Sequence, residues 1–278
     1  MIHTIGEYAS RPVVAVESHS SVLDAMKLMS DKSISCVIAL EHGEPVGILT
    51  ERDIVFAANW LLGQPDLLIN EVMNKPVMTA SSDMTIAQVQ RVFRQHKIRH
   101  LVVLDARLDM AGVFTQTDLV RSLSGEAFAG ISDIIELMTS KVLTVARDVP
   151  ARYALSLMAR RSVSCVVVAD DSFPVGMFTE RDVVRCVAEG IDLATSSVGD
   201  VMSSSIVTTP MTTSPHEAIR IMQEKTVRRV LVVDDFGSVA GILTQTDIGR
   251  VLDQQEASHA GRFLGDTDGL AEASSGPL

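Results

Sequence analysis

A short pattern of polar residues, Gly-x-x-Thr-x-x-Asp, occurs four times in this chain. Its polar pairs are Thr50 with Asp53, Thr115 with Asp118, Thr179 with Asp182, and Thr244 with Asp247. A threonine placed before a helix caps the free amides of the first turn, and an aspartate in that turn is stabilised by the helix dipole. The same groups could bind a ligand, because helix amides suit a phosphate and a carboxylate accepts hydrogen bonds from the two hydroxyls of a ribose. A structural cap and a binding site are both open interpretations of the pattern.

The pattern recurs at a nearly constant interval. Its glycines, Gly47, Gly112, Gly176 and Gly241, lie 65, 64 and 65 residues apart, which indicates a repeat architecture. The first and third copies read Thr-Glu-Arg-Asp, whereas the second and fourth read Thr-Gln-Thr-Asp. The larger unit is therefore a pair of unlike repeats. Two such pairs, which we call module 1 and module 2, make up the chain.

The elements that position the pattern can be predicted from the fourth repeat. A strand at 206–209 is followed by a helix that begins at the capping box 214–217, with proline at its first position. Apolar strands at 230–233 and 239–243 form a hairpin, and Thr244 begins a second helix. The other repeats match this order, with one extra hairpin residue in the even repeats. The sequence thus predicts an α/β (α+β) fold of four β-α-β-β-α repeats, packed as two tandem-pair modules.

The boundaries of the repeats follow from the period. We predict repeats at 1–64, 65–126, 131–192 and 193–253, and a disordered tail at 254–278 rich in Gly, Ala, Ser and Asp. Residues 124–130 are the expected linker between the modules. Three short lead-ins with apolar anchors stand near the start of repeats 2, 3 and 4 and precede their first strands: Glu71–Met73, Glu136–Met138 and Asp200–Met202.

Composition and charge exclude several classes of protein. The net charge of −11 disfavours binding to nucleic-acid backbones or anionic lipid, and a 46% hydrophobic content is sufficient for packed cores. The start of the chain lacks the pattern of a signal peptide, and no apolar stretch reaches the roughly 18 residues of a membrane span. The three cysteines have no metal spacing and indicate a reducing compartment. A cytoplasmic protein is expected.

No combination of residues suggests catalysis. The seven histidines lack metal-ligand spacing, and no Ser-His-Asp set, Cys-His pair, phosphate-binding loop or dinucleotide glycine motif occurs. We therefore expect a protein that is not an enzyme, requires no cofactor and holds no metal. A nucleotide-hydrolysing enzyme is a weaker alternative.

The pattern, its period, the order of the elements and the lead-ins together resemble cystathionine-beta-synthase (CBS) domains over about residues 1–253. Paired repeats of this family, called Bateman modules, pack sheet to sheet around two related clefts that often hold adenosine-containing ligands. The resemblance implies four ribose-binding carboxylates, Asp53, Asp118, Asp182 and Asp247, and four hydroxyls beside phosphate, Thr50, Thr115, Thr179 and Thr244. Adenine would lie between apolar strand residues, for which the chain offers Val37, Ile48, Val102, Val113, Val166, Met177, Leu231 and Ile242. Core packing explains each of these apolar residues equally well.

The resemblance also implies that a basic pair before the second strand contacts phosphate. In the even repeats this place is taken by Arg99-His100 and Arg228-Arg229, and in the odd repeats by Ser35-Cys36 and Ser164-Cys165. Family geometry then predicts one phosphate site in each module: Asp53 with Arg99 and His100, and Asp182 with Arg228 and Arg229. Solvated cations at a strand end are the alternative. Arg52 and Arg181 are expected on helix surfaces, unless they serve the other clefts.

The resulting hypothesis is a ligand-sensing regulatory protein. It would bind AMP, ADP or ATP between paired repeats and signal by conformational change to a regulated protein, an enzyme or a transporter. One chain could build a flat disc of four repeats alone, or two chains could form a homodimer. A protein-interaction scaffold with vestigial clefts and a sensor of S-adenosylmethionine are the competing hypotheses.

Overall fold

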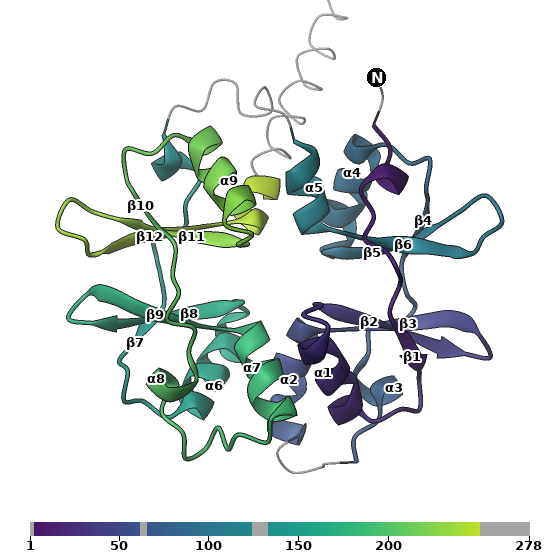
Figure 1. Cartoon of the computed structure of the whole chain (residues 1–278), viewed down its shortest axis with the longest axis horizontal. Helices are drawn as coiled ribbons and strands as arrows, with labels where there is room; N and C mark the ends of the chain where they lie inside the picture. The colour runs from purple at the N-terminus through teal and green to yellow at the C-terminus, as the bar shows by residue number, and fades with distance from the viewer. Residues whose placement is uncertain (1–2, 62–65, 124–132, 251–278) are drawn as a thin grey trace, which may run out of the picture.

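The computed structural model describes residues 3–61, 66–123 and 133–250. Within them, each repeat contributes one three-stranded sheet, and the four repeats form a ring-like disc (Figure 1). This confirms the predicted α+β fold of four similar repeats. The predicted linker at 124–130 and the predicted tail lie outside the described residues.

Repeat 1 shows how the sequence builds the unit. Its elements are β1 (Ala15–Glu17), α1 (Val22–Asp31), β2 (Cys36–Glu41), β3 (Glu44–Thr50) and α2 (Glu51–Leu61). Ser21 begins α1, because its hydroxyl accepts a hydrogen bond from the Leu23 amide at 3.1 Å. The helix then buries Val22, Ala25, Met26 and Met29 along one face. β2 is the central strand, parallel to β1 and antiparallel to β3.

The other repeats copy this arrangement. Repeat 2 contains β4 (Thr79–Ser81), α4 (Ile86–His96), β5 (His100–Leu104), β6 (Met110–Thr115) and α5 (Gln116–Ser122). Repeat 3 contains β7 (Thr144–Val145), α6 (Ala151–Arg161), β8 (Cys165–Asp170), β9 (Phe173–Thr179) and α7 (Glu180–Ala188). Repeat 4 contains β10 (Thr208–Pro210), α9 (Pro215–Glu224), β11 (Arg229–Val233) and β12 (Val239–Thr244), and residues 245–250 are helical.

The lead-in segments pack on the other repeat of their own module. They contain the short helices η1 (Ile5–Glu7), α3 (Ile69–Val72), η3 (Ile134–Glu136) and α8 (Val198–Val201). Met73, which follows α3, lies against Gly47 of repeat 1, where an added Cβ would collide with its sulfur. The other pattern glycines meet equivalent residues: Gly112 meets Ala9, Gly176 meets Met202, and Gly241 meets Met138. The glycine of the pattern therefore permits a close approach that ties the two repeats of a module together.

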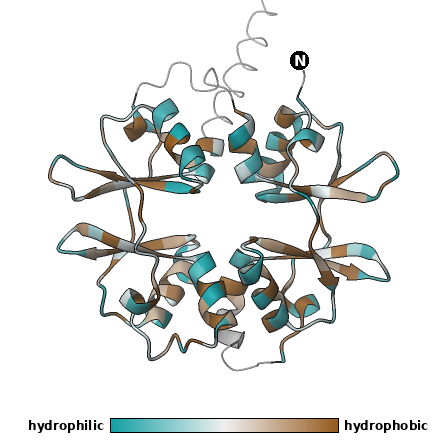
Figure 2. Ribbon diagram, in the orientation of Figure 1, coloured by the Kyte–Doolittle hydropathy of each residue, from teal (hydrophilic) through white to brown (hydrophobic). Residues whose placement is uncertain are grey.

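Within each module the two sheets face one another (Figure 1). Ile38 of repeat 1 packs with Val102 and Val113 of repeat 2, and Val167 of repeat 3 packs with Leu231 of repeat 4. These buried apolar layers hold the two repeats of each module together. Figure 2 shows hydrophobic stretches along the strands and on the helices, interleaved with hydrophilic ones.

The modules meet through their helices, odd repeat against odd repeat and even against even. A single core cluster contains Met26 of α1 and Ala57 of α2 together with Ala154 of α6 and Val183 of α7. On the even side, Val120 of α5 packs in the core of repeat 4. The second helix of each repeat, which begins at the Thr-x-x-Asp pattern, thus lies at the boundary between the modules (Figure 1).

Candidate functional site

The four aspartates of the pattern form the predicted caps. One carboxylate oxygen, Oδ2, accepts hydrogen bonds from the backbone N–H and the hydroxyl of the threonine three residues earlier. In Asp118, for example, these distances are 2.8 Å and 2.7 Å. The structural interpretation is confirmed, and it uses only one of the two oxygens. Any ligand would have to bind the other, Oδ1.

The second oxygen is bound differently in the four repeats. Asp53 Oδ1 accepts a hydrogen bond from Asn74 at 2.6 Å, and Asp182 Oδ1 accepts one from Ser203 at 2.9 Å. Asp247 Oδ1 has longer contacts, with Thr139 and with Arg250, both at 3.2 Å. Asp118 Oδ1 has an ion pair with Arg121 at 3.7 Å. The even repeats therefore hold this oxygen more loosely than the odd repeats do.

Two cavities open beside the aspartates of the even repeats. Cleft 1, of about 310 Å³, is lined by Thr115 and Asp118 of repeat 2, by Ser35 and Cys36 of repeat 1, and by Arg121, Arg181 and Arg228, among others. Cleft 2, of about 180 Å³, is its counterpart in module 2 and is lined by Thr244 and Asp247 of repeat 4, Ser164 and Cys165 of repeat 3, and Arg52 and Arg250, among others. Asp53, Asp182, Thr50 and Thr179 line neither cleft.

The phosphate sites in which the basic residues are paired with Asp53 and Asp182 stay predictions, and the structure shows which partners these residues have without a ligand. Within the described residues, neither Arg99 nor Arg228 has a hydrogen bond or ion pair with Asp53 or Asp182. Burial raises the pKa of Asp53, and the charge of Arg99 offsets part of this rise. Arg99 bonds instead to Glu180 at 3.3 Å and Arg228 to Glu51 at 3.1 Å. Each of these two arginines therefore binds a glutamate of the other module.

Glu51 and Glu180 are the centres of two matching ion-pair clusters. Glu51 binds Arg181 of repeat 3 at 3.1 Å and Arg228 of repeat 4 at 3.1 Å. Glu180 binds Arg52 of repeat 1 at 3.0 Å and Arg99 of repeat 2 at 3.3 Å. The side chains of Glu51 and Glu180 are only 5% and 4% exposed. A buried carboxylate is costly unless it is paired, and the two guanidiniums bound to each glutamate compensate its charge.

The even repeats make the equivalent contact without charge. The Thr117 hydroxyl donates to Gln245 Oε1 at 2.8 Å, and the Thr246 hydroxyl donates to Gln116 Oε1 at 3.1 Å. In both the odd and the even repeats, the residue that follows the pattern threonine thus contacts the residue that precedes the pattern aspartate in the other module. The alternation of Glu-Arg with Gln-Thr in the sequence corresponds to this odd-with-odd and even-with-even pairing.

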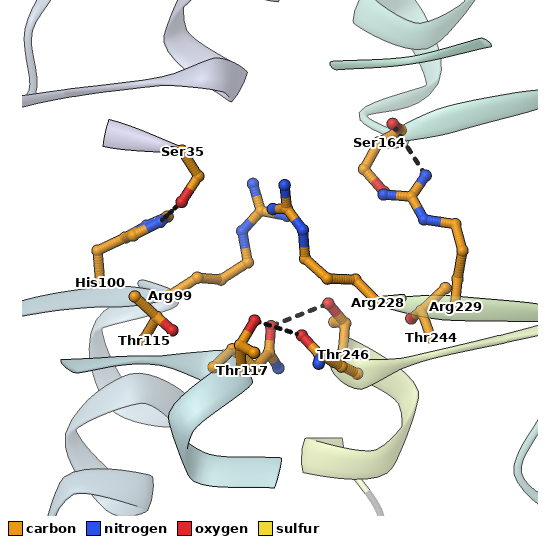
Figure 3. A pocket seen from close by; sticks show the side chains of 12 residues that line it. Ser35, Arg99, His100, Thr115, Thr117, Ser164, Arg228, Arg229, Thr244 and Thr246 are labelled. Carbon is orange, nitrogen blue, oxygen red and sulfur yellow. Dashed lines mark hydrogen bonds between the residues drawn. The ribbon is translucent and has the colours of Figure 1, made fainter. Parts of the chain in front are cut away.

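A small central cavity lies where all four repeats converge (Figure 3). Its volume is about 40 Å³, and Figure 3 shows the guanidiniums of Arg99 and Arg228 approaching each other across it. The cavity shares Ser35, Thr115, Thr117 and Arg228 with cleft 1, and Ser164, Thr244 and Thr246 with cleft 2. Both clefts therefore lead toward the same cationic centre.

His100 and Arg229, the other basic residues of the prediction, lie at equivalent positions and differ in charge. His100 bonds to the Ser35 hydroxyl at 3.0 Å, and burial, aided by the charge of Arg99, lowers its pKa to about 3. His100 is therefore neutral near pH 7 and offers no charge to a phosphate. Arg229 donates to the carbonyl oxygen of Ser164 at 3.3 Å. Module 2 thus has a cation at the place where module 1 has a neutral ring.

The carboxylates respond to these surroundings in opposite directions. Burial raises the pKa of Asp53 and of Asp118, although the hydrogen bonds from their cap threonines oppose it. For Glu51, burial alone would also raise the pKa, but the charges of Arg228 and Arg181 outweigh it and hold the pKa below its usual range. Burial lowers the pKa of both Arg99 and Arg228, opposed by Glu180 and Glu51 respectively. Because an arginine remains protonated in proteins, these clusters stay charged.

Two of the adenine candidates lie on the wrong face of their strands. Val37 and Val166 belong to the core under the helices, whereas Ile38 and Val167 face the partner sheet. The prediction counted back an equal number of residues from each pattern glycine, but the hairpins of the even repeats are one residue longer. In the odd repeats this count ends one residue too early, and a one-residue shift moves a strand side chain to the other face of the sheet. Val102, Val113, Met177, Leu231 and Ile242 do face between the sheets and are buried in the core, and Ile48 packs partly buried beside them. Packing between the sheets thus explains these six residues.

Other kinds of site find no support in the residues that the structure describes. No group of three or more His, Cys, Asp or Glu side chains there could hold a metal ion. Among the described helices, none combines the length and the apolar character that crossing a membrane requires.

Comparison with known proteins places the chain in a family. The CBS domain model matches residues 5–59, 69–125, 131–189 and 198–253. The chain belongs to the CBS domain family. The prediction of four tandem CBS repeats in two pairs is thereby confirmed.

Two solved structures are similar to this chain. The structure of MJ1225 from Methanocaldococcus jannaschii, described as a putative archaeal homolog of g-AMPK, superposes with a TM-score of 0.76 at 16% identity and covers 89% of this chain and 99% of that one. This likeness confirms the fold of all four repeats. The CBS domain protein PAE2072 from Pyrobaculum aerophilum, which was solved in complex with AMP, is 25% identical, covers 41% of this chain and 88% of that one, and has a TM-score of 0.39.

A relative with an enzyme name matches only in part. L-aspartate semialdehyde sulfurtransferase of M. jannaschii is 30% identical over 141 residues, which is 50% of this chain and 27% of that protein. This chain therefore matches only about a quarter of that enzyme's length.

The cross-module clusters are the feature that sequence reasoning missed. Glu51 and Glu180 were not predicted as site residues. Arg52 and Arg181 were expected on helix surfaces, with a role in the other clefts as the alternative. In the structure Arg52 lines cleft 2 and Arg181 lines cleft 1. The signal was nevertheless present in the sequence. Glutamate and arginine occupy the variable positions in both odd patterns, and glutamine and threonine occupy them in both even patterns.

Proposed function

We propose that this protein is a ligand-sensing regulator that binds an adenine nucleotide, AMP, ADP or ATP, in cleft 1 and cleft 2. The observation that carries the proposal is the repeated set of groups: each cleft joins a pattern aspartate, its threonine and two or more arginines beside an apolar sheet edge. Asp118 and Asp247 would bind the ribose hydroxyls through Oδ1. Thr115 and Thr244 would lie on the phosphate side.

The charge of the clefts favours a phosphate-bearing ligand over other adenosyl compounds. Arg121, Arg181 and Arg228 line cleft 1, and Arg52 and Arg250 line cleft 2. Guanidiniums bind phosphate oxygens through two parallel hydrogen bonds. S-adenosylmethionine carries a sulfonium cation and would gain less from these residues, so it is the second candidate ligand.

The position of cleft 1 supports a regulatory role. Its lining includes Ser35, Thr115, Arg181 and Arg228, one from each of the four repeats. A ligand that contacts both modules stabilises one relative arrangement of them and so shifts the population of conformations. Coupling on the order of 1–3 kcal/mol is usual for such a link. The regulated protein, an enzyme or a transporter, would read this change, and the chain itself needs no catalytic residues or cofactor.

The test compares aspartates that have the same cap but different surroundings. Binding of AMP, ADP, ATP and S-adenosylmethionine would be measured by calorimetry and by thermal shift on wild type, Asp118→Asn, Asp247→Asn and the matched control Asp53→Asn. Each variant keeps a side-chain oxygen able to accept the cap hydrogen bonds. We expect about two nucleotides per wild-type chain, about one in each of the even variants, and an unchanged number in Asp53→Asn.

Two outcomes would contradict the proposal. No stabilisation by any of the ligands at millimolar concentration would favour an interaction scaffold with vestigial clefts, since a ligand that binds only the folded protein must stabilise it. An equal loss in Asp53→Asn and Asp118→Asn would place the ligand elsewhere than in cleft 1.

A further inference from the structure

The arginines of the clefts already have anionic partners. Arg181 and Arg228, which line cleft 1, are both bound to Glu51. Arg52, which lines cleft 2, is bound to Glu180, and so is Arg99 of the central cavity. An entering phosphate would therefore meet guanidiniums whose charge is already compensated by a buried carboxylate of the protein itself.

Each glutamate joins three repeats through these bonds. Among the described residues, the side-chain partners of Glu51 of repeat 1 all belong to module 2, and those of Glu180 of repeat 3 all belong to module 1. The hydrogen bonds that would be lost to a phosphate are thus the same bonds that cross the boundary between the modules. Neither glutamate lines cleft 1, cleft 2 or the central cavity, so neither would contact the ribose or the base directly.

We infer that Glu51 and Glu180 are internal counter-ions that set the charge selectivity of the clefts, and that their displacement by a phosphate group loosens the contact between modules. This inference rests on the proposed function. A neutral nucleoside binds without disturbing the glutamates. A nucleotide must compete with a carboxylate for Arg228 or Arg52, so a ligand with several phosphate charges competes better than a ligand with one.

The size of the central cavity fits this role. Its volume of about 40 Å³ is enough for about three water molecules at roughly 10–15 Å³ each, and far too small for a nucleotide. A phosphate group that extends from either cleft would enter it beside Arg99 and Arg228 (Figure 3). These are the arginines that Glu180 and Glu51 hold.

The chain itself provides the substitution that tests the inference. Gln116 and Gln245 occupy in the even repeats the position that Glu51 and Glu180 occupy in the odd repeats. Glu51→Gln and Glu180→Gln therefore remove the charge while keeping the shape, with a residue that this position accepts elsewhere in the protein. Glu217→Gln is the matched control, because it changes the net charge equally and lies in an exposed ion pair with Arg220.

The experiment measures four probes on the full chain: adenosine, AMP, ATP and inorganic pyrophosphate. Dissociation constants are obtained for wild type, the two single variants, the double variant Glu51→Gln with Glu180→Gln, and the control. In the double variant we expect ATP and pyrophosphate to bind on the order of tenfold more tightly, and adenosine to bind as in wild type. Without anion the double variant should also melt at a lower temperature than wild type, and pyrophosphate should reverse this loss. If the double variant does not fold, each single variant should show a smaller change of the same sign.

The outcomes separate this inference from the proposed function. If adenosine and AMP bind to wild type but the affinity for ATP and pyrophosphate is the same in every variant, the inference is wrong and the proposed function stands. If no nucleoside binds but pyrophosphate binds the double variant more tightly than wild type, the counter-ion role stands and the adenosine ligand is wrong. If no probe binds to any variant, both are wrong.

Discussion

The odd and even repeats contain the same Thr-x-x-Asp pattern and use it in different ways. In the odd repeats the aspartate is held on both oxygens, by its own threonine and by Asn74 or Ser203. In the even repeats the second oxygen has longer contacts and lies beside a cleft. The same cap thus leaves the second oxygen with short, direct hydrogen bonds in the odd repeats and with longer contacts in the even repeats.

The residues between threonine and aspartate show the same division. Glu51 and Glu180 form buried ion pairs between the modules, whereas Gln116 and Gln245 form neutral hydrogen bonds at the equivalent place. A buried charge whose partner is removed costs far more than a neutral hydrogen bond that is lost. The two sides of the boundary between modules should therefore differ strongly in their sensitivity to substitution.

The largest expected effect is on the odd side. Glu180→Gln leaves Arg52 and Arg99 without their carboxylate and should lower the free energy of unfolding by about 3 kcal/mol, the lower end of the range for a broken buried ion pair, because both arginines keep some contact with water. Thr117→Val removes the hydroxyl that donates to Gln245 and should cost about 1 kcal/mol. Urea denaturation at neutral pH measures both. If the two variants lose the same free energy of unfolding, the buried ion pairs of the odd repeats stabilise the boundary no more than the neutral hydrogen bonds of the even repeats do.

Much of the fold could be predicted from the sequence, because the signals are local. Capping residues, apolar helix faces and the apolar strands of each hairpin are recognised from residues close together in the chain, and the fixed period extended the prediction from one repeat to all four. The ion pairs between modules could not be predicted in this way. Arg52 and Glu180 are 128 residues apart, and only the packing of α2 near α7 brings them together. The one-residue error at Val37 and Val166 has a different cause, the longer hairpins of the even repeats.

A smaller effect distinguishes the two even repeats. The pKa of His100 is about 3 in the folded protein, below the value of 6.5 expected for an unperturbed histidine. As the pH falls below 6.5, protons bind the unfolded chain but not the folded one, so stability decreases until the pH approaches 3. The contribution of His100 between pH 7.5 and pH 5.0 is a loss of about 2 kcal/mol. Arg229, at the equivalent place in repeat 4, makes no such contribution, because an arginine stays protonated over this range.

The measurement is the urea midpoint of wild type and His100→Asn at the two pH values. Asparagine can still form a hydrogen bond but does not titrate in this range. The variant should lose less stability than wild type on acidification, and the difference isolates His100 from every other titrating group. If the two proteins respond equally to pH, the buried and neutral state of His100 is wrong.

The smallest expected effect concerns the caps that all four repeats share. Each threonine hydroxyl accepts the backbone N–H of its aspartate at 3.3–3.4 Å and donates to the carboxylate of that residue at 2.6–2.7 Å. Thr50→Ala, Thr115→Ala, Thr179→Ala and Thr244→Ala should each cost about 1 kcal/mol, the usual value for a lost N-cap. Thermal or urea denaturation should show similar losses in odd and even repeats, and serine in place of each threonine should restore most of the stability. Nucleotide affinity should fall only in Thr115→Ala and Thr244→Ala, since these are the two of the four cap threonines that line the clefts. Equal losses of affinity in all four variants would show that the caps act on binding only through folding, and the difference between odd and even repeats would then lie entirely in the residues between threonine and aspartate.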